Sequence, residues 1–224
     1  MERLRVGDLT LAYDVRGDGP PMVLLHGAGE RAASWDTVRD ALAQRFTTYA
    51  VDLRGHGDSD WPGEYRHALI EADVCALLDA VGLSGVVLVG HSLGGNIGFR
   101  VAAHRPDLVA RLVVEDVIPP WPRTRRVPPR PDRELDYDWD AVPALMGEAS
   151  TRDDVAWDEL GLIVAPTLLV SGGAGSHLPV EKVAEVVARI PDCVMVEIDA
   201  GHHVHRREPG QFLSAVLGWL AVRG

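Results

Sequence analysis

The chain has 224 residues, a formal net charge of −11 at pH 7, 46% hydrophobic residues and 25% charged residues. This composition is typical of a folded globular protein and excludes a disordered chain. The acidic excess argues against a nucleic-acid partner, and no stretch approaches the ~18 apolar residues that span a membrane. Residues 1–10 alternate polar and apolar side chains without the apolar core of a secretory signal, so we expect a cytoplasmic protein.

The first elements along the chain read as strands. Residues 3–15 alternate apolar and polar side chains around Gly7-Asp8, which predicts a β-hairpin. Six short apolar runs follow, each too short for a stable helix and rich in valine and leucine, so we expect strands buried on both faces. These runs are Met22–Leu25, Thr48–Val51, Val86–Val89, Leu112–Val114, Thr167–Val170 and Cys193–Ile198.

Helical patterns separate these runs. Ser34 is predicted to cap a helix that runs to about Ala43. Strands and helices alternate along nearly the whole chain, which predicts one α/β domain (residues 1–224) with a mostly parallel, twisted sheet covered by helices on both faces. Ligands bind at the carboxyl ends of the strands in such sheets. The other predicted helices are Arg66–Val81, Gly94–His104, Val180–Ile190 and Pro209–Val222.

One segment interrupts the alternation. Residues 118–158 contain seven prolines and three tryptophans and show no clear strand, so we expect an insertion over the strand ends. The segment also holds a short basic run, Arg123 to Arg130. This run is interpreted as a solvated loop in preference to an anion site.

The run Gly90-His91-Ser92-Leu93-Gly94 lies between a predicted strand and a predicted helix. This is the G-x-S-x-G pattern in the setting that a nucleophile elbow requires. The glycines are needed because a side chain at either position would meet the neighbouring strand or helix. The turn exposes the serine hydroxyl above the sheet, and the helix that follows points its amides toward a developing oxyanion. Ser92 is therefore the predicted nucleophile.

Three more motifs follow predicted strands: His-Gly-Ala-Gly at 26–29, Asp-Leu-Arg-Gly-His-Gly-Asp-Ser at 52–59, and Gly-His at 201–202. Together with the serine motif they resemble the α/β-hydrolase superfamily over nearly the full length of the chain. The resemblance implies an oxyanion hole made by the Ala28 and Leu93 amides. It also implies a cap at residues 117–160, which is short for this superfamily. His26 and the 52–59 loop, including His56, are interpreted as structural.

A general base is needed to take the serine proton, and histidine suits the role because its pKa lies near neutrality. The match to the Gly-His pair favours His202, with His203 and His205 as competitors. The carboxylate that orients the histidine is the feature in which this sequence differs from many members of the superfamily. The loop 171–179 after the seventh strand contains no carboxylate, and Ser176 stands where the aspartate would be.

Some members of the superfamily carry the acid after the sixth strand, where this chain has Glu115-Asp116. We predict Asp116 as the acid that orients the histidine, with Glu115 as the alternative and Asp199 as a weaker candidate. Glu115 and Asp116 could instead serve only to stabilise the cap.

Candidate substrate-binding residues are Trp121 and Trp139 in the cap and His177 beside the vacated acid position. The cap aromatics could equally anchor the cap to the core, and His177 could pack beneath it. Neither Cys75 nor Cys193 has histidines at metal-ligand spacing, so no metal is predicted, and acyl transfer needs no cofactor.

The sequence predicts a serine hydrolase that cleaves an ester, lactone or thioester of a small molecule through an acyl-enzyme. Two alternatives stay open: a biosynthetic acyltransferase or cyclase with the same triad, and a non-catalytic ligand-binding member of the fold. The sequence makes no prediction about the natural substrate or the oligomeric state.

Overall fold

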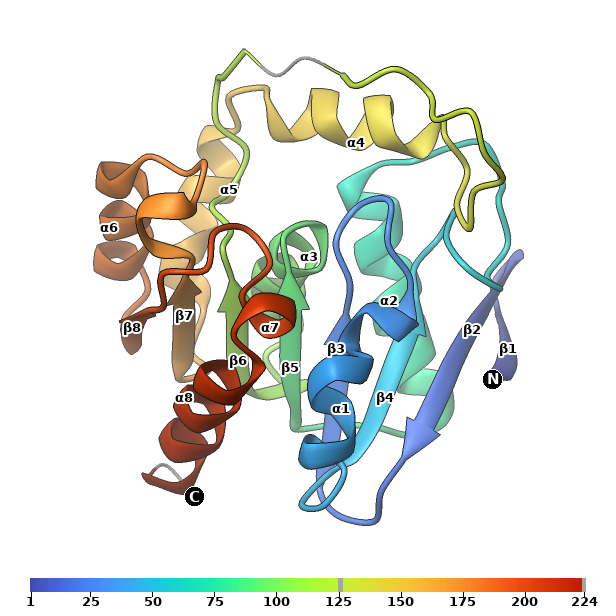
Figure 1. Cartoon of the computed structure of the whole chain (residues 1–224). Coiled ribbons are helices and arrows are strands. Elements are labelled where there is room, and N and C mark those ends of the chain that lie inside the picture. The colour runs from blue at the N-terminus through green and yellow to red at the C-terminus, as the bar shows by residue number, and fades with distance from the viewer. Residues whose placement is uncertain (125–126, 223–224) are drawn as a thin grey trace.

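The computed structural model describes residues 1–124 and 127–222 (Figure 1). Within these residues, eight strands form one sheet in the order β1-β2-β4-β3-β5-β6-β7-β8. The pairs β1–β2 and β2–β4 are antiparallel and all the others are parallel. The strands are β1 (Glu2–Val6), β2 (Leu9–Arg16), β3 (Pro21–Leu25), β4 (Thr47–Asp52), β5 (Val86–His91), β6 (Val109–Glu115), β7 (Thr167–Ser171) and β8 (Cys193–Glu197).

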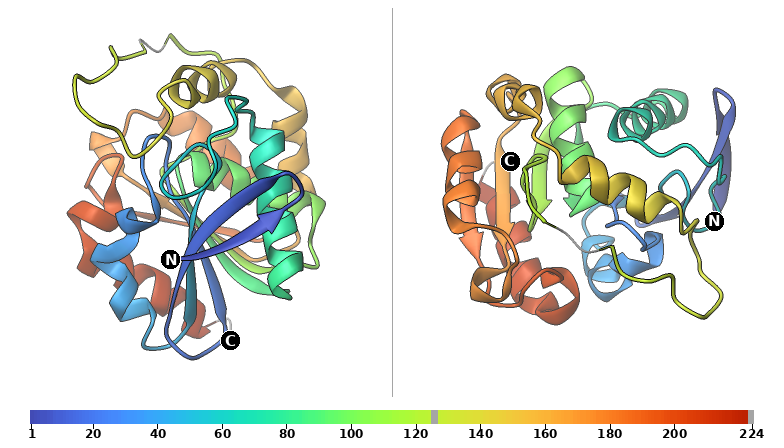
Figure 2. Two further views of the ribbon diagram at one scale, coloured as in Figure 1. Left: turned by 90° about the vertical axis from the view of Figure 1, so that its right-hand side faces the viewer. Right: turned by 90° about the horizontal axis from the view of Figure 1, so that it is seen from above.

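Helices cover both faces of this sheet (Figure 2). On one face, α1 (Asp36–Leu42), α7 (Val204–Arg207) and α8 (Pro209–Val222) enclose a core cluster that includes Trp35 and Phe212. On the other face, α2 (His67–Val81), α3 (Leu93–His104) and α6 (Val180–Arg189) enclose a larger cluster. The predicted α/β-hydrolase fold, with a mostly parallel sheet between two helical layers, is confirmed.

Two local predictions are wrong. Ser34 does not cap α1, because the chain already turns as a 3-10 helix at Ala32–Trp35, and Trp35 precedes α1 without a side-chain cap. The expectation that every parallel strand is buried on both faces fails at β8. That strand lies at the edge of the sheet, so its Val194 and Met195 are exposed.

The long connection between β6 and β7 lies across the top of the molecule in Figure 1, over the carboxyl ends of the strands. It contains α4 (Ala141–Ala149), α5 (Asp154–Asp158) and a 3-10 turn at Glu159–Leu162. The helix α4 was not expected from the sequence. Its Pro143 lies in the first helical turn, where the missing N–H has no helical partner to lose. Residues 125 and 126 of the basic run lie outside the described residues.

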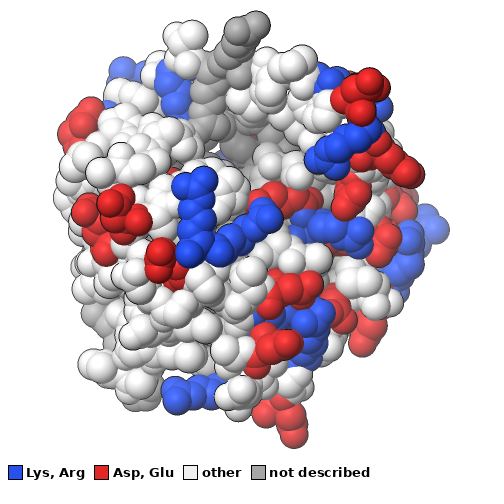
Figure 3. All heavy atoms as spheres, in the orientation of Figure 1, with Lys and Arg blue, Asp and Glu red and all other residues white. Residues whose placement is uncertain are grey.

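The helices in the described part of the chain are either too short or too polar to cross a membrane. On the face shown in Figure 3, acidic and basic side chains are interspersed. A nucleic-acid-binding surface gathers basic residues into a patch or stripe. The sequence-based expectation that nucleic acid is not a partner stays a prediction.

Candidate active site

Ser92 lies at the sharp turn between β5 and α3, with a φ of 51°. Positive φ is unfavourable for a residue with a side chain, and such strain is concentrated at functional sites. The turn is possible because its flanks are glycines. A Cβ on Gly90 would lie 2.3 Å from the Gly94 carbonyl oxygen, and a Cβ on Gly94 would lie 2.2 Å from the Leu25 carbonyl oxygen. The expected steric role of both glycines is confirmed.

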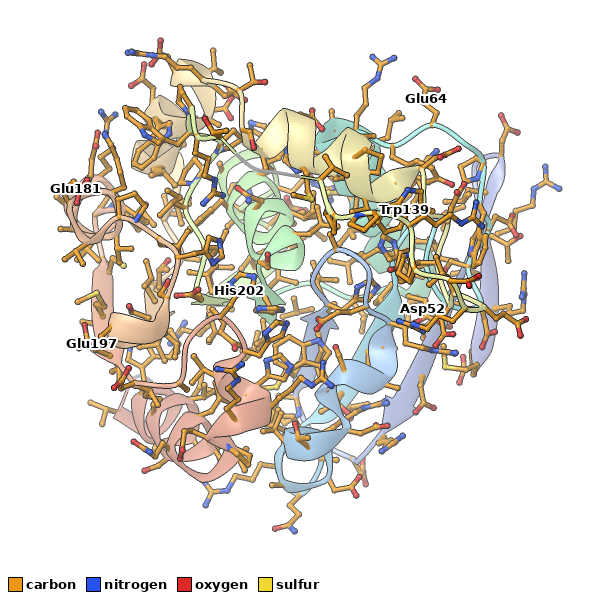
Figure 4. All side chains as sticks on the ribbon, turned by 45° about the horizontal axis from the view of Figure 1, so that its top comes forward. Asp52, Glu64, Trp139, Glu181, Glu197 and His202 are labelled. Carbon is orange, nitrogen blue, oxygen red and sulfur yellow. The ribbon has the colours of Figure 1, made fainter. Side chains whose placement is uncertain are left out.

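The structure brings Ser92, His202 and Asp116 together from three different loops. His202 Nε2 lies 3.1 Å from Ser92 Oγ, and His202 Nδ1 lies 2.8 Å from Asp116 Oδ2. Figure 4 shows His202 toward the middle of the molecule. With the proton on Nδ1, the imidazole donates to Asp116 and accepts from the Ser92 hydroxyl. This is the nucleophile–base–orienter geometry that nucleophilic catalysis requires.

Asp116 follows β6 with a φ of 44°, and its carboxylate is held by three donors. The Gly172 amide donates to Oδ1 at 3.0 Å, while the Ser176 hydroxyl and His202 Nδ1 donate to Oδ2 at 3.0 and 2.8 Å. Burial favours the neutral carboxyl, but these hydrogen bonds outweigh it and hold the pKa of Asp116 below its usual value. The position after β7 that lacks a carboxylate therefore supplies a serine that binds the carboxylate from β6.

The pKa of His202 is lowered because the ring is largely buried and because His91 lies beside it, while Asp116 acts in the opposite direction. The two rings are 4.7 Å apart. His91 Nε2 lies 2.7 Å from the His202 carbonyl oxygen, and His91 Nδ1 lies 3.3 Å from a Glu30 oxygen. Burial opposes its charge, but Glu115, Glu30 and the carbonyl raise the pKa of His91 to about 9. A charged His91 favours the neutral base form of His202.

Glu115, the alternative acid, does not contact His202. It is fully buried, and its carboxylate accepts from the backbone N–H of His205 at 3.0 Å and lies 2.7 Å from His205 Nδ1. Asp116, just past the end of β6, is instead the residue whose carboxylate reaches His202.

His203, the other competitor for the base, contacts Glu30 at 3.3 Å. Asp199 lies near Gly175, 3.4 Å from its amide.

The loop after β3 is rigidly held around Ala28. The Gly27 amide donates to Glu30, and the Gly29 amide donates to His56 Nε2 at 3.0 Å. Ala28 and Leu93 both line the pocket at Ser92, and Leu93 opens α3, where first-turn amides have no helical acceptor. This placement suits an oxyanion hole.

His26 and His56 have the structural roles expected of them. Buried His26 contacts the Gly27 carbonyl oxygen through Nδ1 and accepts from the Leu53 amide through Nε2, and burial lowers its pKa to about 3. His56 fixes the loop around Ala28 because its Nε2 accepts a hydrogen bond from the Gly29 amide.

Two cavities meet at Ser92. A narrow pocket, partly open to solvent, is lined by Ser92, His202 and His177, and also by Arg123 of the cap. A wider groove of about 340 Å³ is lined by Trp139. Figure 4 shows Trp139 beside α4. The volume of the wider groove is of the order found for small-molecule sites. The aromatic ring of His177 lies 4.5 Å from that of His202 in an edge-to-face arrangement.

Trp121, a predicted substrate-binding residue, lines neither cavity. Its ring packs edge-on against Trp157 at 5.9 Å, and the Lys182 ammonium lies 3.5 Å above it. The contact with Lys182, on α6, attaches the cap to the core, which is the alternative role considered for Trp121. The basic run is also only partly a solvated loop, since Arg130 is exposed but Arg123 faces the pocket.

Asp116, His177 and His202 each place one ligand atom within 4.8 Å of the others, which is close enough for the three to hold a metal ion. Both His202 nitrogens are, however, already engaged by Ser92 and Asp116 at hydrogen-bonding distance. The hydrogen-bonded arrangement is that of a proton relay. Cys75 and Cys193 are free thiols.

Comparison with known proteins agrees with this geometry. The family model of the alpha/beta hydrolase fold matches residues 20–156, which is more than half of the chain, and the chain therefore belongs to the α/β-hydrolase family. A hydrolase from Pseudomonas aeruginosa PA01 has the same fold, with a TM-score of 0.86 at 24% identity over 98% of this chain and 97% of that one.

Two curated relatives have named activities. The chain is 39% identical over 118 residues to 2-(acetamidomethylene)succinate hydrolase of Mesorhizobium japonicum, covering 52% of this chain and 42% of the relative. It is 28% identical over 275 residues to an esterase of Mycobacterium tuberculosis, covering 100% of this chain and 90% of the esterase. The chain spans less than half the length of several curated relatives, and only 30% of three uncharacterised mycobacterial proteins.

Proposed function

We propose that this chain is a serine hydrolase that cleaves a small ester, lactone or thioester through an acyl-enzyme. The observation that carries the proposal is the continuous series of contacts from Ser92 Oγ through His202 to Asp116, at 3.1 and 2.8 Å. Ser92 and His202 lie where the narrow pocket and the wider groove meet, so a substrate carbonyl has access from both sides.

In the first half of the reaction, Ser92 Oγ attacks the carbonyl carbon while His202 Nε2 takes the hydroxyl proton. The Ala28 and Leu93 amides stabilise the negative charge on the carbonyl oxygen. Asp116 holds the Nδ1 proton and stabilises the imidazolium. His202 then gives its proton to the leaving oxygen or sulfur, and the acyl group stays on Ser92.

In the second half, His202 takes a proton from a water molecule that attacks the acyl-enzyme. His202 then returns this proton to Ser92 Oγ as the acyl–oxygen bond breaks and the acid is released. The groove beside Ser92 includes space open to solvent, and this favours water over a second organic nucleophile. Hydrolysis is therefore preferred to acyl transfer or cyclisation. The names of the mycobacterial esterase and the succinate hydrolase agree with a hydrolytic reaction.

The test measures kcat/KM on p-nitrophenyl acetate and butanoate together with labelling by a fluorophosphonate. We expect turnover and a covalent adduct on Ser92 in the wild type, and neither in Ser92→Ala. Ser84→Ala is the matched control, because Ser84 is exposed in the loop that precedes β5. A wild type that neither hydrolyses these esters nor takes up the label contradicts the proposal and favours the non-catalytic alternative.

A further inference from the structure

We propose that the narrow pocket binds a carboxylate carried by the substrate, and that Arg123 of the cap is the residue that recognises it. The inference rests on the proposed function and specifies its substrate class. The substrates are small esters whose acyl half is narrow and carries a negatively charged carboxylate in addition to the ester group. Neither the serine motif nor the triad requires such a charge.

The first observation is the position of Arg123. It comes from the connection between β6 and α4, yet it lines the same pocket as Ser92 and His202. Its Nε and Nη1 atoms are shielded from solvent. A guanidinium offers five N–H donors in a planar fork that matches the geometry of a carboxylate.

The second observation is the charge around it. Among the described residues that line the narrow pocket, Arg123 is the one cationic side chain that keeps its charge at every physiological pH. Burial lowers the pKa of His67 and of His202, which favours their neutral forms. The carboxylate in this lining, Asp116, is already held by three donors. The pocket therefore presents a positive charge to an incoming ligand.

The third observation is the contrast between the two cavities. Trp139, Tyr137 and three prolines line the groove, together with Glu30, which suits an uncharged aromatic or apolar group. The walls of the narrow pocket around Arg123 include Val117, Ile118 and Leu145, which suit a short methylene chain. A charge-assisted hydrogen bond at the end of such a chain is stronger than one between neutral groups.

The experiment compares two esters of equal acyl length, monobenzyl succinate and benzyl butanoate, whose aromatic halves suit the groove. We expect the wild type to prefer the succinate ester by at least about tenfold in kcat/KM. Arg123→Gln should lower kcat/KM for the succinate ester by about 10- to 100-fold and change that for benzyl butanoate by less than about threefold. Arg123→Lys should restore part of the preference, because it restores the charge without the planar fork.

Arg130→Gln is the matched control, since Arg130 lies in the same segment but is exposed and lines neither cavity. It should leave the ratio of the two esters unchanged. A wild type without the preference, or an Arg123→Gln variant that loses both activities equally, overturns the inference while leaving the serine mechanism intact.

Binding of succinate to the Ser92→Ala variant, followed by calorimetry, separates this inference from the proposed function because it needs no catalysis. We expect Arg123→Gln in that background to weaken succinate binding by at least about tenfold. Should the wild type prove inert on every ester, this loss still supports the carboxylate site. Succinate binding that is absent, or equal with and without Arg123, rejects it.

Discussion

Replacing Asp116 by asparagine should abolish most of the activity without unfolding the protein. The Asp116 carboxylate accepts from the Gly172 amide, the Ser176 hydroxyl and His202 Nδ1. An asparagine has the same shape but only one oxygen, and its NH₂ group donates. It cannot accept all three hydrogen bonds.

Two orientations of the new amide are possible, and both cost activity or stability. With its oxygen toward Gly172, its NH₂ faces His202 Nδ1, and the imidazole proton must move to Nε2, where it blocks acceptance from Ser92. With its oxygen toward His202, two N–H donors face each other at about the 3.0 Å that separates Gly172 N from Asp116 Oδ1, which costs about 1–3 kcal/mol. The first orientation relieves that clash and should dominate. The wrong tautomer lowers kcat by about 10⁴-fold, or about 5.4 kcal/mol.

The assay is kcat on p-nitrophenyl butanoate together with the free energy of unfolding in urea. Glu115→Gln is the matched comparison, because Glu115 is the adjacent carboxylate but binds His205 instead of His202. It should lower the free energy of unfolding by about 1–3 kcal/mol and kcat by less than about tenfold. The reasoning is refuted if Asp116→Asn keeps more than a tenth of wild-type kcat, or if Glu115→Gln loses as much kcat as Asp116→Asn.

Three more outcomes are expected. Adding Ser176→Asp to the Asp116→Asn variant should increase kcat by at least about tenfold, since the Ser176 hydroxyl already lies 3.0 Å from Asp116 Oδ2. No increase would mean that a carboxylate in the loop after β7 cannot reach His202. The acid limb of the pH profile of kcat/KM should have its midpoint below pH 6.5, because His202 must be neutral to accept a proton. Burial and the charged His91 both lower the pKa of His202, so a midpoint above pH 6.5 contradicts this. Chelation by EDTA should leave kcat unchanged, while added Zn²⁺ should inhibit the wild type more strongly than His177→Ala, and activity lost to EDTA would indicate a metal hydrolase.

Sequence patterns predicted the fold well because the relevant signals are local. Buried parallel strands such as Val86–Val89 are continuous apolar runs, and Gly90 and Gly94 mark a turn that no larger residue fits. Motifs that follow strands fall on one edge of a parallel sheet, so the grouping of Ser92 and His202 could be anticipated without coordinates.

Features that depend on contacts between distant segments were harder to predict. The cap contains no motif, and its tryptophans are compatible with both ligand binding and anchoring. Only the approach of Lys182, on α6, reveals that Trp121 anchors the cap. The side chain of Arg123 also enters the pocket from a proline-rich loop whose path the sequence does not determine. Proline fixes the backbone angle φ of single residues but not where the loop lies.

The sequence favoured two neighbouring residues, Asp116 and Glu115, as the acid, with Asp199 as a weaker candidate. Which of the two neighbours lies beside His202 depends on the sheet. In the β5–β6 pairing, His91 lies opposite Glu115, so Ser92 and Asp116 are the next residues of adjacent strands. The hydrogen bonds continue past the strand ends: the Ser92 amide donates to the Glu115 carbonyl oxygen at 3.1 Å, and the Asp116 amide donates to the Val170 carbonyl oxygen at 2.8 Å.

Within the described residues, Ser92 and Asp116 are the two non-glycine residues with positive φ. Each therefore leaves the sheet with a positive φ, next to the neighbouring strand and at the edge where His202 lies. Such strain costs about 1–3 kcal/mol per residue and persists where the surrounding structure holds it. Because the sheet places both residues at this edge, the carboxylate after β6 lies where it orients His202, although the loop after β7 contains no carboxylate.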